Sequence, residues 1–141
     1  MKYNAMNNNN RIMILDDDIF FGNLVKNFLK NHFEEKIDHF TIEDVFLRQL
    51  TSEPSIIILD HHLNGCSGLD IIPQILSISP SSTIIYLSGQ EFMHVAIKAM
   101  RMGVVDYIEK DRNSFYQLKH IIDKVLFKPH SDGESQQFLA S

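Results

Sequence analysis

The sequence has little of several features that define other classes of protein. It has one cysteine, Cys66, in 141 residues, so no disulfide can form within the chain. Its apolar runs are far shorter than the roughly 20 residues that a membrane-spanning helix needs. Basic residues are outnumbered, since 13 Lys and Arg stand against 18 Asp and Glu, for a formal net charge of −5. We therefore expect no membrane segment and no direct binding of nucleic acid by this domain.

The two ends of the chain lack the apolar patterning of a folded core. Residues 1–10 are rich in asparagine and predict a disordered arm, without the apolar stretch of a signal peptide. Residues 128–141 are mostly polar and predict a tail or linker. We expect residues 11–127 to form one domain, and a cytoplasmic location for the protein.

Within that domain, apolar runs of strand length alternate five times with segments of helical spacing. The strands are expected at 11–15, 36–40, 55–59, 83–88 and 105–110. The helices are expected at 20–33, 41–50, 68–78, 91–103 and 114–127. This alternation predicts a single (βα)5 domain of the α/β class, with a five-stranded parallel sheet of order 2-1-3-4-5 and helices on both faces.

Local signals add detail to the first two helices. Asp18 stands where an N-cap belongs before the first helix, and Thr41 is expected to cap the second. The phenylalanines at helical spacing in 20–33 are expected to be core residues. The second helix is expected to bury Val45 and Phe46.

Polar residues that can carry chemistry follow the expected strands. The third strand is apolar on both faces, which is typical of an interior parallel strand, and Asp60 follows it directly. Asp16 and Asp17 follow the first strand in the same way. In the order 2-1-3-4-5, these carboxylates meet Ser88 and Lys110 at the carboxyl edge of the sheet.

This group of residues predicts a site that accepts a phosphoryl group. Three carboxylates in one cleft repel one another unless a cation lies among them, and carboxylate oxygens suit Mg²⁺. An aspartate beside Mg²⁺ can attack phosphorus and form an aspartyl phosphate. Lys110 adds a positive charge and Ser88 a hydroxyl donor for the phosphoryl oxygens.

At these motifs the sequence resembles the receiver domains of two-component response regulators, which have a CheY-like fold. The resemblance covers roughly residues 11–127. It rests on four motifs in family order: ILDDD at 14–18, ILD at 58–60 with Gly68 eight residues later, YLSG at 86–89, and DYIEK at 106–110.

The resemblance implies a role for each residue of the acidic cluster. Asp60 would be the phosphoacceptor, phosphorylated by a histidine kinase or a phosphotransfer protein. Asp16 and Asp17 would hold Mg²⁺ (or Mn²⁺) together with Asp60 and the backbone carbonyl of His62. The domain would be no enzyme beyond its own phosphorylation and dephosphorylation.

The resemblance also implies a switch. Ser88 would move onto the phosphate, Lys110 would bind it, and Tyr107 would change rotamer when the hydroxyl moves. The surface of the fourth helix, fifth strand and fifth helix would then be remodelled to control a partner, an output domain or a homodimer.

Three positions depart from the family pattern. Asn64 and Asp111 stand where prolines are usual, and Ser67 stands where an acidic residue is usual. The loop after the third strand is therefore expected to turn differently. A cis bond before a residue other than proline costs about 3–4 kcal/mol, so we expect a trans bond before Asp111 and an altered approach of Lys110.

Other readings of single residues stay open. His61 and His62 could be plain loop residues, or His62 could tune hydrolysis of the aspartyl phosphate together with Gln90. A transition-metal site could use Asp60 with both histidines and Cys66. Otherwise Cys66 is a small, half-buried residue.

Some motifs are also similar to those of other protein families. The DHH at 60–62 is similar to the signature of a metal-dependent phosphoesterase family, and Asp16–Asp18 to the first motif of haloacid-dehalogenase-like phosphatases, which normally has Thr or Val where Phe20 stands. A pseudo-receiver would bind partners without phosphorylation. A receiver could act alone, or could precede a DNA-binding output domain beyond residue 141.

Overall fold

The computed structural model describes residues 11–89 and 93–127. The expected arm at 1–10, the expected tail at 128–141 and Gln90 lie outside the described residues. Among the helices of the described ranges, none is long and apolar enough to cross a membrane.

A parallel sheet of five strands forms the centre of the domain, in the order β2-β1-β3-β6-β7. Because β4 and β5 belong to a separate short hairpin, this order is the expected 2-1-3-4-5. The five strands are β1 (Arg11–Leu15), β2 (Lys36–Phe40), β3 (Ile56–Asp60), β6 (Thr83–Ser88) and β7 (Asp106–Glu109).

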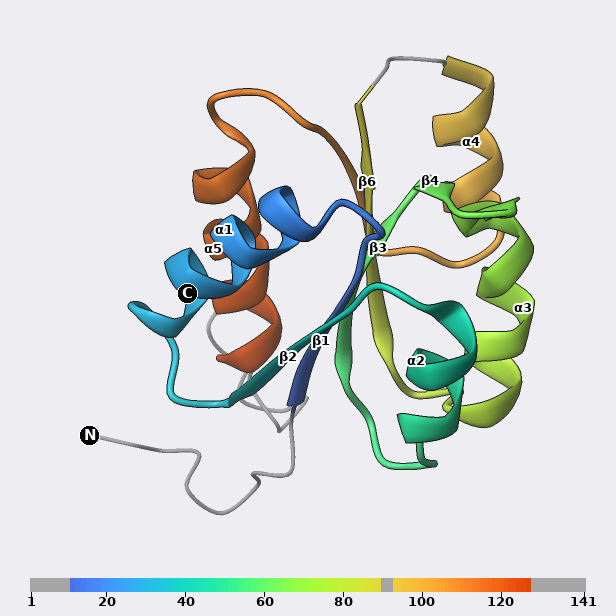
Figure 1. Ribbon diagram of the computed structural model, residues 1–141, viewed down its shortest axis with the longest axis horizontal. Coiled ribbons are helices and arrows are strands. Elements are labelled where there is room, and N and C mark those ends of the chain that lie inside the picture. Colours follow the sequence, from blue (N-terminus) through green and yellow to red (C-terminus); the bar gives the residue numbers. More distant parts are fainter. Residues whose placement is uncertain (1–10, 90–92, 128–141) are drawn as a thin grey trace, which may run out of the picture.

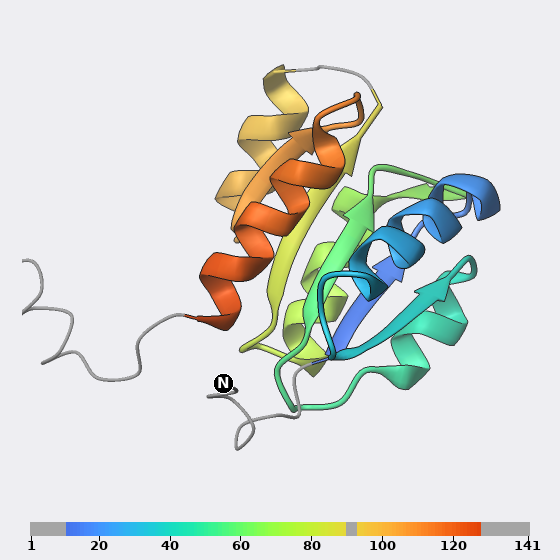
Figure 2. The same ribbon diagram turned by 90° about the vertical axis from the view of Figure 1, so that its left-hand side faces the viewer.

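Five helices cover both faces of the sheet, as the sequence predicts. They are α1 (Ile19–Lys30), α2 (Glu43–Gln49), α3 (Gly68–Ile78), α4 (Met93–Arg101) and α5 (Ser114–Leu126). Helices α1 and α5 lie on one face, and α2, α3 and α4 on the other (Figure 1). The view turned by 90° shows α1 and α5 in front of the sheet (Figure 2).

Strand β3 is buried along its whole length and supplies both cores. Ile57 and Leu59 belong to the core under α2, α3 and α4, whereas Ile56 and Ile58 belong to the core under α1 and α5. Side chains alternate between the two faces of a strand, so a central strand that is covered on both sides has to be apolar throughout. This is why the apolar run of β3 ends only at Asp60.

The local expectations for the first two helices hold in part. Asp18 caps α1, since its carboxylate accepts a hydrogen bond from the Phe21 amide at 3.0 Å. The N-cap of α2 is Ile42 and not Thr41. Two residues that were expected in the core face solvent instead. The exposed fraction is 74% for Phe20 and 37% for Val45.

The loop after β3, which was expected to turn differently from the family pattern, contains a short hairpin that the sequence did not predict. Strands β4 (His62–Leu63) and β5 (Cys66–Ser67) pair antiparallel. Gly65 has φ of 87° in the connecting turn, a conformation that residues with a Cβ rarely adopt. Ser67, one of the departures from the family pattern, forms a capping box with Asp70 at the start of α3.

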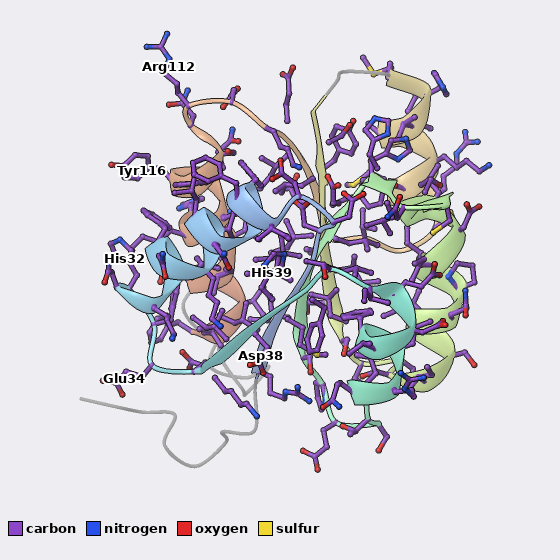
Figure 3. All side chains as sticks on the ribbon, in the orientation of Figure 1. His32, Glu34, Asp38, His39, Arg112 and Tyr116 are labelled. Atoms are coloured by element: carbon purple, nitrogen blue, oxygen red, sulfur yellow. The ribbon has the colours of Figure 1, made fainter. Side chains whose placement is uncertain are left out.

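A close approach between α1 and β2 supports the loop after β1. Figure 3 shows His39 between these two elements, and its Nε2 lies 2.8 Å from the Asp16 carbonyl oxygen. A carbonyl only accepts, so Nε2 is the protonated nitrogen. A Cβ built on Gly22 would lie 2.0 Å from the same Nε2. Gly22 therefore leaves the space in which His39 can hold the Asp16 backbone.

We predict that Gly22→Ala lowers the free energy of unfolding by about 1–2 kcal/mol, because overpacking against His39 outweighs the better helix propensity of alanine. Urea denaturation measures this change. In a His39→Ala background the clash is absent, so the same Gly22→Ala substitution should stabilise the protein by up to about 1 kcal/mol. Destabilisation of equal size in both backgrounds would refute the role given to His39.

Candidate functional site

Two buried carboxylates stand side by side at the carboxyl edge of the sheet. Asp60 is the last residue of β3 and Asp16 directly follows β1, so the parallel pairing of these strands brings both to the same edge. Asp16 is 2% exposed and Asp60 is 3% exposed. Asp17 is half-buried, and one carboxylate oxygen of each of the three residues lies within 4.8 Å of the others.

Lys110 follows β7 and completes the cluster with a positive charge. Its amide donates to the Ser88 carbonyl at 2.8 Å, which extends the β6–β7 pairing by one residue. Its Nζ lies 2.9 Å from Asp60 Oδ1 and 3.1 Å from Asp16 Oδ2. The contact with Asp60 is an ion pair and not a well-directed hydrogen bond, so Oδ1 keeps accepting capacity. The described residues contain no cis peptide bond, as expected for the bond before Asp111.

An aromatic ring also holds the Lys110 ammonium, and the sequence analysis did not identify it. Nζ lies 4.3 Å from the centroid of the Phe21 ring, a distance suited to a cation–π interaction. Phe21 projects from the first turn of α1 and packs at 5.9 Å against Phe115 of α5. Its spacing predicted only a core residue, because the contact with Lys110 joins positions that are distant along the chain.

The electrostatics of the cluster favour a bound cation. Burial and the neighbouring Asp16 carboxylate raise the pKa of Asp60 to about 6, although Lys110 acts in the opposite direction. Burial acts to lower the pKa of Lys110, but the carboxylates of Asp60 and Asp16 outweigh it and raise that pKa. The carboxylates thus outnumber the contacting ammonium in a site shielded from water.

Three clustered carboxylates, one with an underused oxygen, are a donor set for a hard divalent cation. The described residues offer this single group of three or more His, Cys, Asp and Glu side chains that could hold a metal, and His61, His62 and Cys66 are not part of it. The described residues therefore do not bring together the donors of the transition-metal alternative. Cys66 donates to Glu43 at 3.3 Å, and burial, with this contact, raises the pKa of its thiol to about 11.

Ser88 and Tyr107 lie on the strands beside Asp60. Ser88 is fully buried at the end of β6, one residue beyond Leu87, which pairs with Asp60. Tyr107 is half-buried on β7, and its ring stacks on the Tyr86 ring with centroids 5.9 Å apart. The structure therefore brings the expected hydroxyl to the edge of the sheet, with the expected aromatic residue on the neighbouring strand.

The two histidines after Asp60 differ in their surroundings. The His62 side chain is exposed, whereas His61 Nδ1 lies 2.6 Å from the hydroxyl of Tyr86. Burial and the nearby His62 lower the pKa of His61, and burial raises the pKa of Tyr86 well above its usual range. In the sequence, Tyr86 is part of an apolar strand, and its spacing indicates only burial. Sequence spacing could not predict that its hydroxyl would contact His61.

The family comparison agrees with this geometry. The sequence model of the response regulator receiver domain matches residues 12–130. An NtrX-like response regulator from Rickettsia felis is 34% identical over 107 residues, which are 73% of this chain and 22% of the relative. The response regulator protein TodT from Pseudomonas putida is 30% identical over 100 residues, which are 70% of this chain and 44% of TodT. The chain thus spans less than half the length of these two relatives.

Solved structures share the fold. A CheY-like receiver domain protein from Methanospirillum hungatei has a TM-score of 0.74 at 20% identity, covering 83% of this chain and 93% of its own. TrrA from Thermotoga maritima, in complex with Mg²⁺-BeF, has a TM-score of 0.69 at 26% identity, covering 82% and 97%. A Burkholderia pseudomallei response regulator with a phosphorylated aspartic acid, calcium ion and citrate has a TM-score of 0.70 at 22% identity, covering 95% and 75%.

The family match extends over most of the chain, and the strand order and the fold of the solved structures agree with it. The chain belongs to the response regulator receiver domain family.

Proposed function

We propose that Asp60 is the phosphoacceptor of this receiver domain. The observation that carries the proposal is the contact of the Lys110 ammonium with the buried Asp60 and Asp16 carboxylates at the carboxyl edge of the sheet. The donor would be a phosphohistidine of a histidine kinase or a phosphotransfer protein. An Asp60 carboxylate oxygen forms a bond to phosphorus, the bond from phosphorus to the donor imidazole nitrogen breaks, and the imidazole leaves with the electron pair.

The neighbouring residues would bind and orient the incoming group. Asp16 and Asp17 would hold Mg²⁺ (or Mn²⁺) with Asp60 and the His62 carbonyl, and the ion would neutralise the phosphoryl oxygens. Lys110 neutralises a further oxygen and favours the ionised form of Asp60, which is the form that attacks. TrrA, at 26% identity, was solved with Mg²⁺-BeF, which supports Mg²⁺ as the ion.

Phosphorylation would be read out through Ser88 and Tyr107. The Ser88 hydroxyl would move onto the phosphate, and Tyr107 would take a new rotamer, which changes the surface of α4, β7 and α5. That surface would contact a partner, a second copy of the domain, or a DNA-binding output domain beyond residue 141. Because this chain spans 22% of its NtrX-like relative, an output domain is part of the proposal.

We also expect several properties that rest on the sequence alone. His62 and Gln90 would tune hydrolysis of the aspartyl phosphate, and the domain would have no enzymatic activity beyond its own phosphorylation and dephosphorylation. A cytoplasmic location and the single domain at 11–127 stay predictions. A pseudo-receiver is the weaker alternative, because Lys110 contacts both Asp16 and Asp60 in the arrangement that phosphoryl transfer needs.

The first test is phosphorylation by a small donor. We expect acetyl phosphate with Mg²⁺ to add one phosphoryl mass to the protein, and we expect no gain in Asp60→Asn or after removal of the metal with EDTA. Intact-mass spectrometry measures the gain. Asp44→Asn, an exposed aspartate of α2 outside the metal-binding group, is the matched control and should behave as wild type. A gain of equal size in Asp60→Asn would refute Asp60 as the acceptor.

The raised pKa of Asp60 also predicts how stability depends on pH. Between the unfolded value of 3.8 and about 6, the folded protein binds more protons at Asp60, so stability falls as pH rises through this window. Above about pH 6, with EDTA present to remove metal, the free energy of unfolding of Asp60→Asn should exceed that of wild type by up to about 3 kcal/mol. The difference should fade towards pH 4.

Urea denaturation at pH 4.5 and pH 7.5 measures this difference. The exposed Asp44→Asn is the control, with an expected change of about 0.5 kcal/mol or less at either pH. Added Mg²⁺ should stabilise wild type at pH 7.5 more than Asp60→Asn. An Asp60→Asn variant that is no more stable than wild type at pH 7.5 would contradict the electrostatic account.

The ring of Phe21 should increase the rate of phosphorylation, because it holds the Lys110 ammonium in place. Phe21→Leu keeps an apolar side chain but removes the cation–π contact, so we expect phosphorylation by acetyl phosphate to slow about three- to tenfold. The rate of mass gain measures it. Phe115→Leu is the matched control, because Phe115 packs on Phe21. Equal slowing in both variants would assign the effect to packing and not to Lys110.

A further inference from the structure

A tyrosine on β6, between β3 and β7, contacts both the loop after Asp60 and Tyr107. Tyr86 lies on β6 and its side chain is fully buried. Its hydroxyl is 2.6 Å from Nδ1 of His61, the residue that follows Asp60. Its ring stacks on Tyr107 of β7, with centroids 5.9 Å apart and an angle of 23° between the planes. One side chain therefore touches both regions that the proposed switch involves.

The Tyr86 hydroxyl makes a hydrogen bond with the His61 ring. Nδ1 of a neutral imidazole accepts in one tautomer and donates in the other, and a phenol hydroxyl can do either, so the bond forms with both tautomers of His61. The hydroxyl thus joins β6 to the residue after Asp60.

The buried Tyr86 ring packs closely against the backbone of the loop after Asp60. A Cβ built on Gly68 would lie 2.5 Å from the Asp60 carbonyl oxygen and 2.8 Å from both Cε1 and the hydroxyl oxygen of Tyr86. The His61 carbonyl accepts from the Gly68 amide at 2.8 Å, which closes the loop over the ring. Close-packed groups transmit a shift instead of absorbing it. The peptide after Asp60 and the Tyr86 ring are therefore packed closely enough for one to influence the position of the other.

We propose that Tyr86 is a positioning residue that couples the backbone after Asp60 to the Tyr107 side chain, through its hydrogen bond to His61 and its stacking on Tyr107. The proposal rests on the proposed function, since Tyr107 is taken as the switch residue. It adds a second connection, independent of the Ser88 hydroxyl. Phosphorylation that moves the loop at His61 would change the position of Tyr86 and with it the preferred rotamer of Tyr107.

The test is a double-mutant cycle read at Tyr107 in the full chain without phosphate. Tyr86→Phe removes only the hydroxyl, and His61→Phe keeps a flat ring but removes Nδ1. Tyrosines labelled with ¹³C at the ε carbons give one set of ring signals per residue, and Tyr107→Phe identifies that of Tyr107. His32→Ala, an exposed histidine on the turn after α1, is the control.

We expect His61→Phe to change the Tyr107 rotamer equilibrium by about fivefold, the effect of one neutral hydrogen bond. In the Tyr86→Phe background the same substitution should leave the Tyr107 signals unchanged, because the hydrogen bond is already absent. His32→Ala should leave them unchanged in both backgrounds. An equal shift in both backgrounds, or no shift in either, would overturn the proposal. A purely structural role of Tyr86 would lower stability without this dependence on background.

A parallel measurement separates this proposal from the proposed function. The same samples are treated with Mg²⁺ and beryllofluoride, and with acetyl phosphate for intact mass. Tyr86→Phe should still gain the phosphoryl mass, but its Tyr107 signals should respond at least about twofold less to beryllofluoride than those of wild type. If wild type gains no mass, the phosphoacceptor function fails, and the cycle without phosphate still decides whether Tyr86 couples His61 to Tyr107.

Discussion

The contact between the Lys110 ammonium and the buried carboxylates of Asp16 and Asp60 is the interaction on which the site depends. Two buried carboxylates that stand this close repel each other, and burial alone already disfavours their charge. Lys110 reaches both from β7, two strands away from β3, because parallel strands end at one edge of the sheet. The strand order is therefore a requirement of the electrostatics as well as of the fold.

The carboxylate of Asp60, the proposed phosphoacceptor, opposes folding in the metal-free protein at neutral pH. The pKa of Asp60 is raised to about 6 even with Lys110 beside it, so ionised Asp60 destabilises the metal-free protein at neutral pH. The same excess of negative charge is what attracts a divalent cation, and a bound cation removes the repulsion. Functional residues that oppose folding are common at sites of chemistry, and the surrounding core makes up the difference.

Neighbouring side chains hold each reactive group in place. His39 holds the Asp16 backbone, Phe21 faces the Lys110 ammonium, and Tyr86 holds His61. Gly22 and Gly68 leave the space for two of these rings, since a Cβ at either position would collide with them. The geometry at the edge of the sheet thus depends on packing between elements that are far apart in sequence.

The sequence by itself determined the five strands of the main sheet, the five helices, their order, and the polar residues that end the strands. Apolar runs and helical spacing are local signals, and right-handed βα connections leave few ways to arrange five units, so Asp16, Asp60, Ser88 and Lys110 could be predicted at one edge. Tertiary structure alone decided which partners these residues have. Phe21, Tyr86 and His39 lie in segments whose periodicity indicates only burial or strand, and Phe20 and Val45 fit the same spacing yet face solvent. Contacts across the sheet depend on three-dimensional packing, and a linear pattern does not encode which apolar or polar group stands opposite.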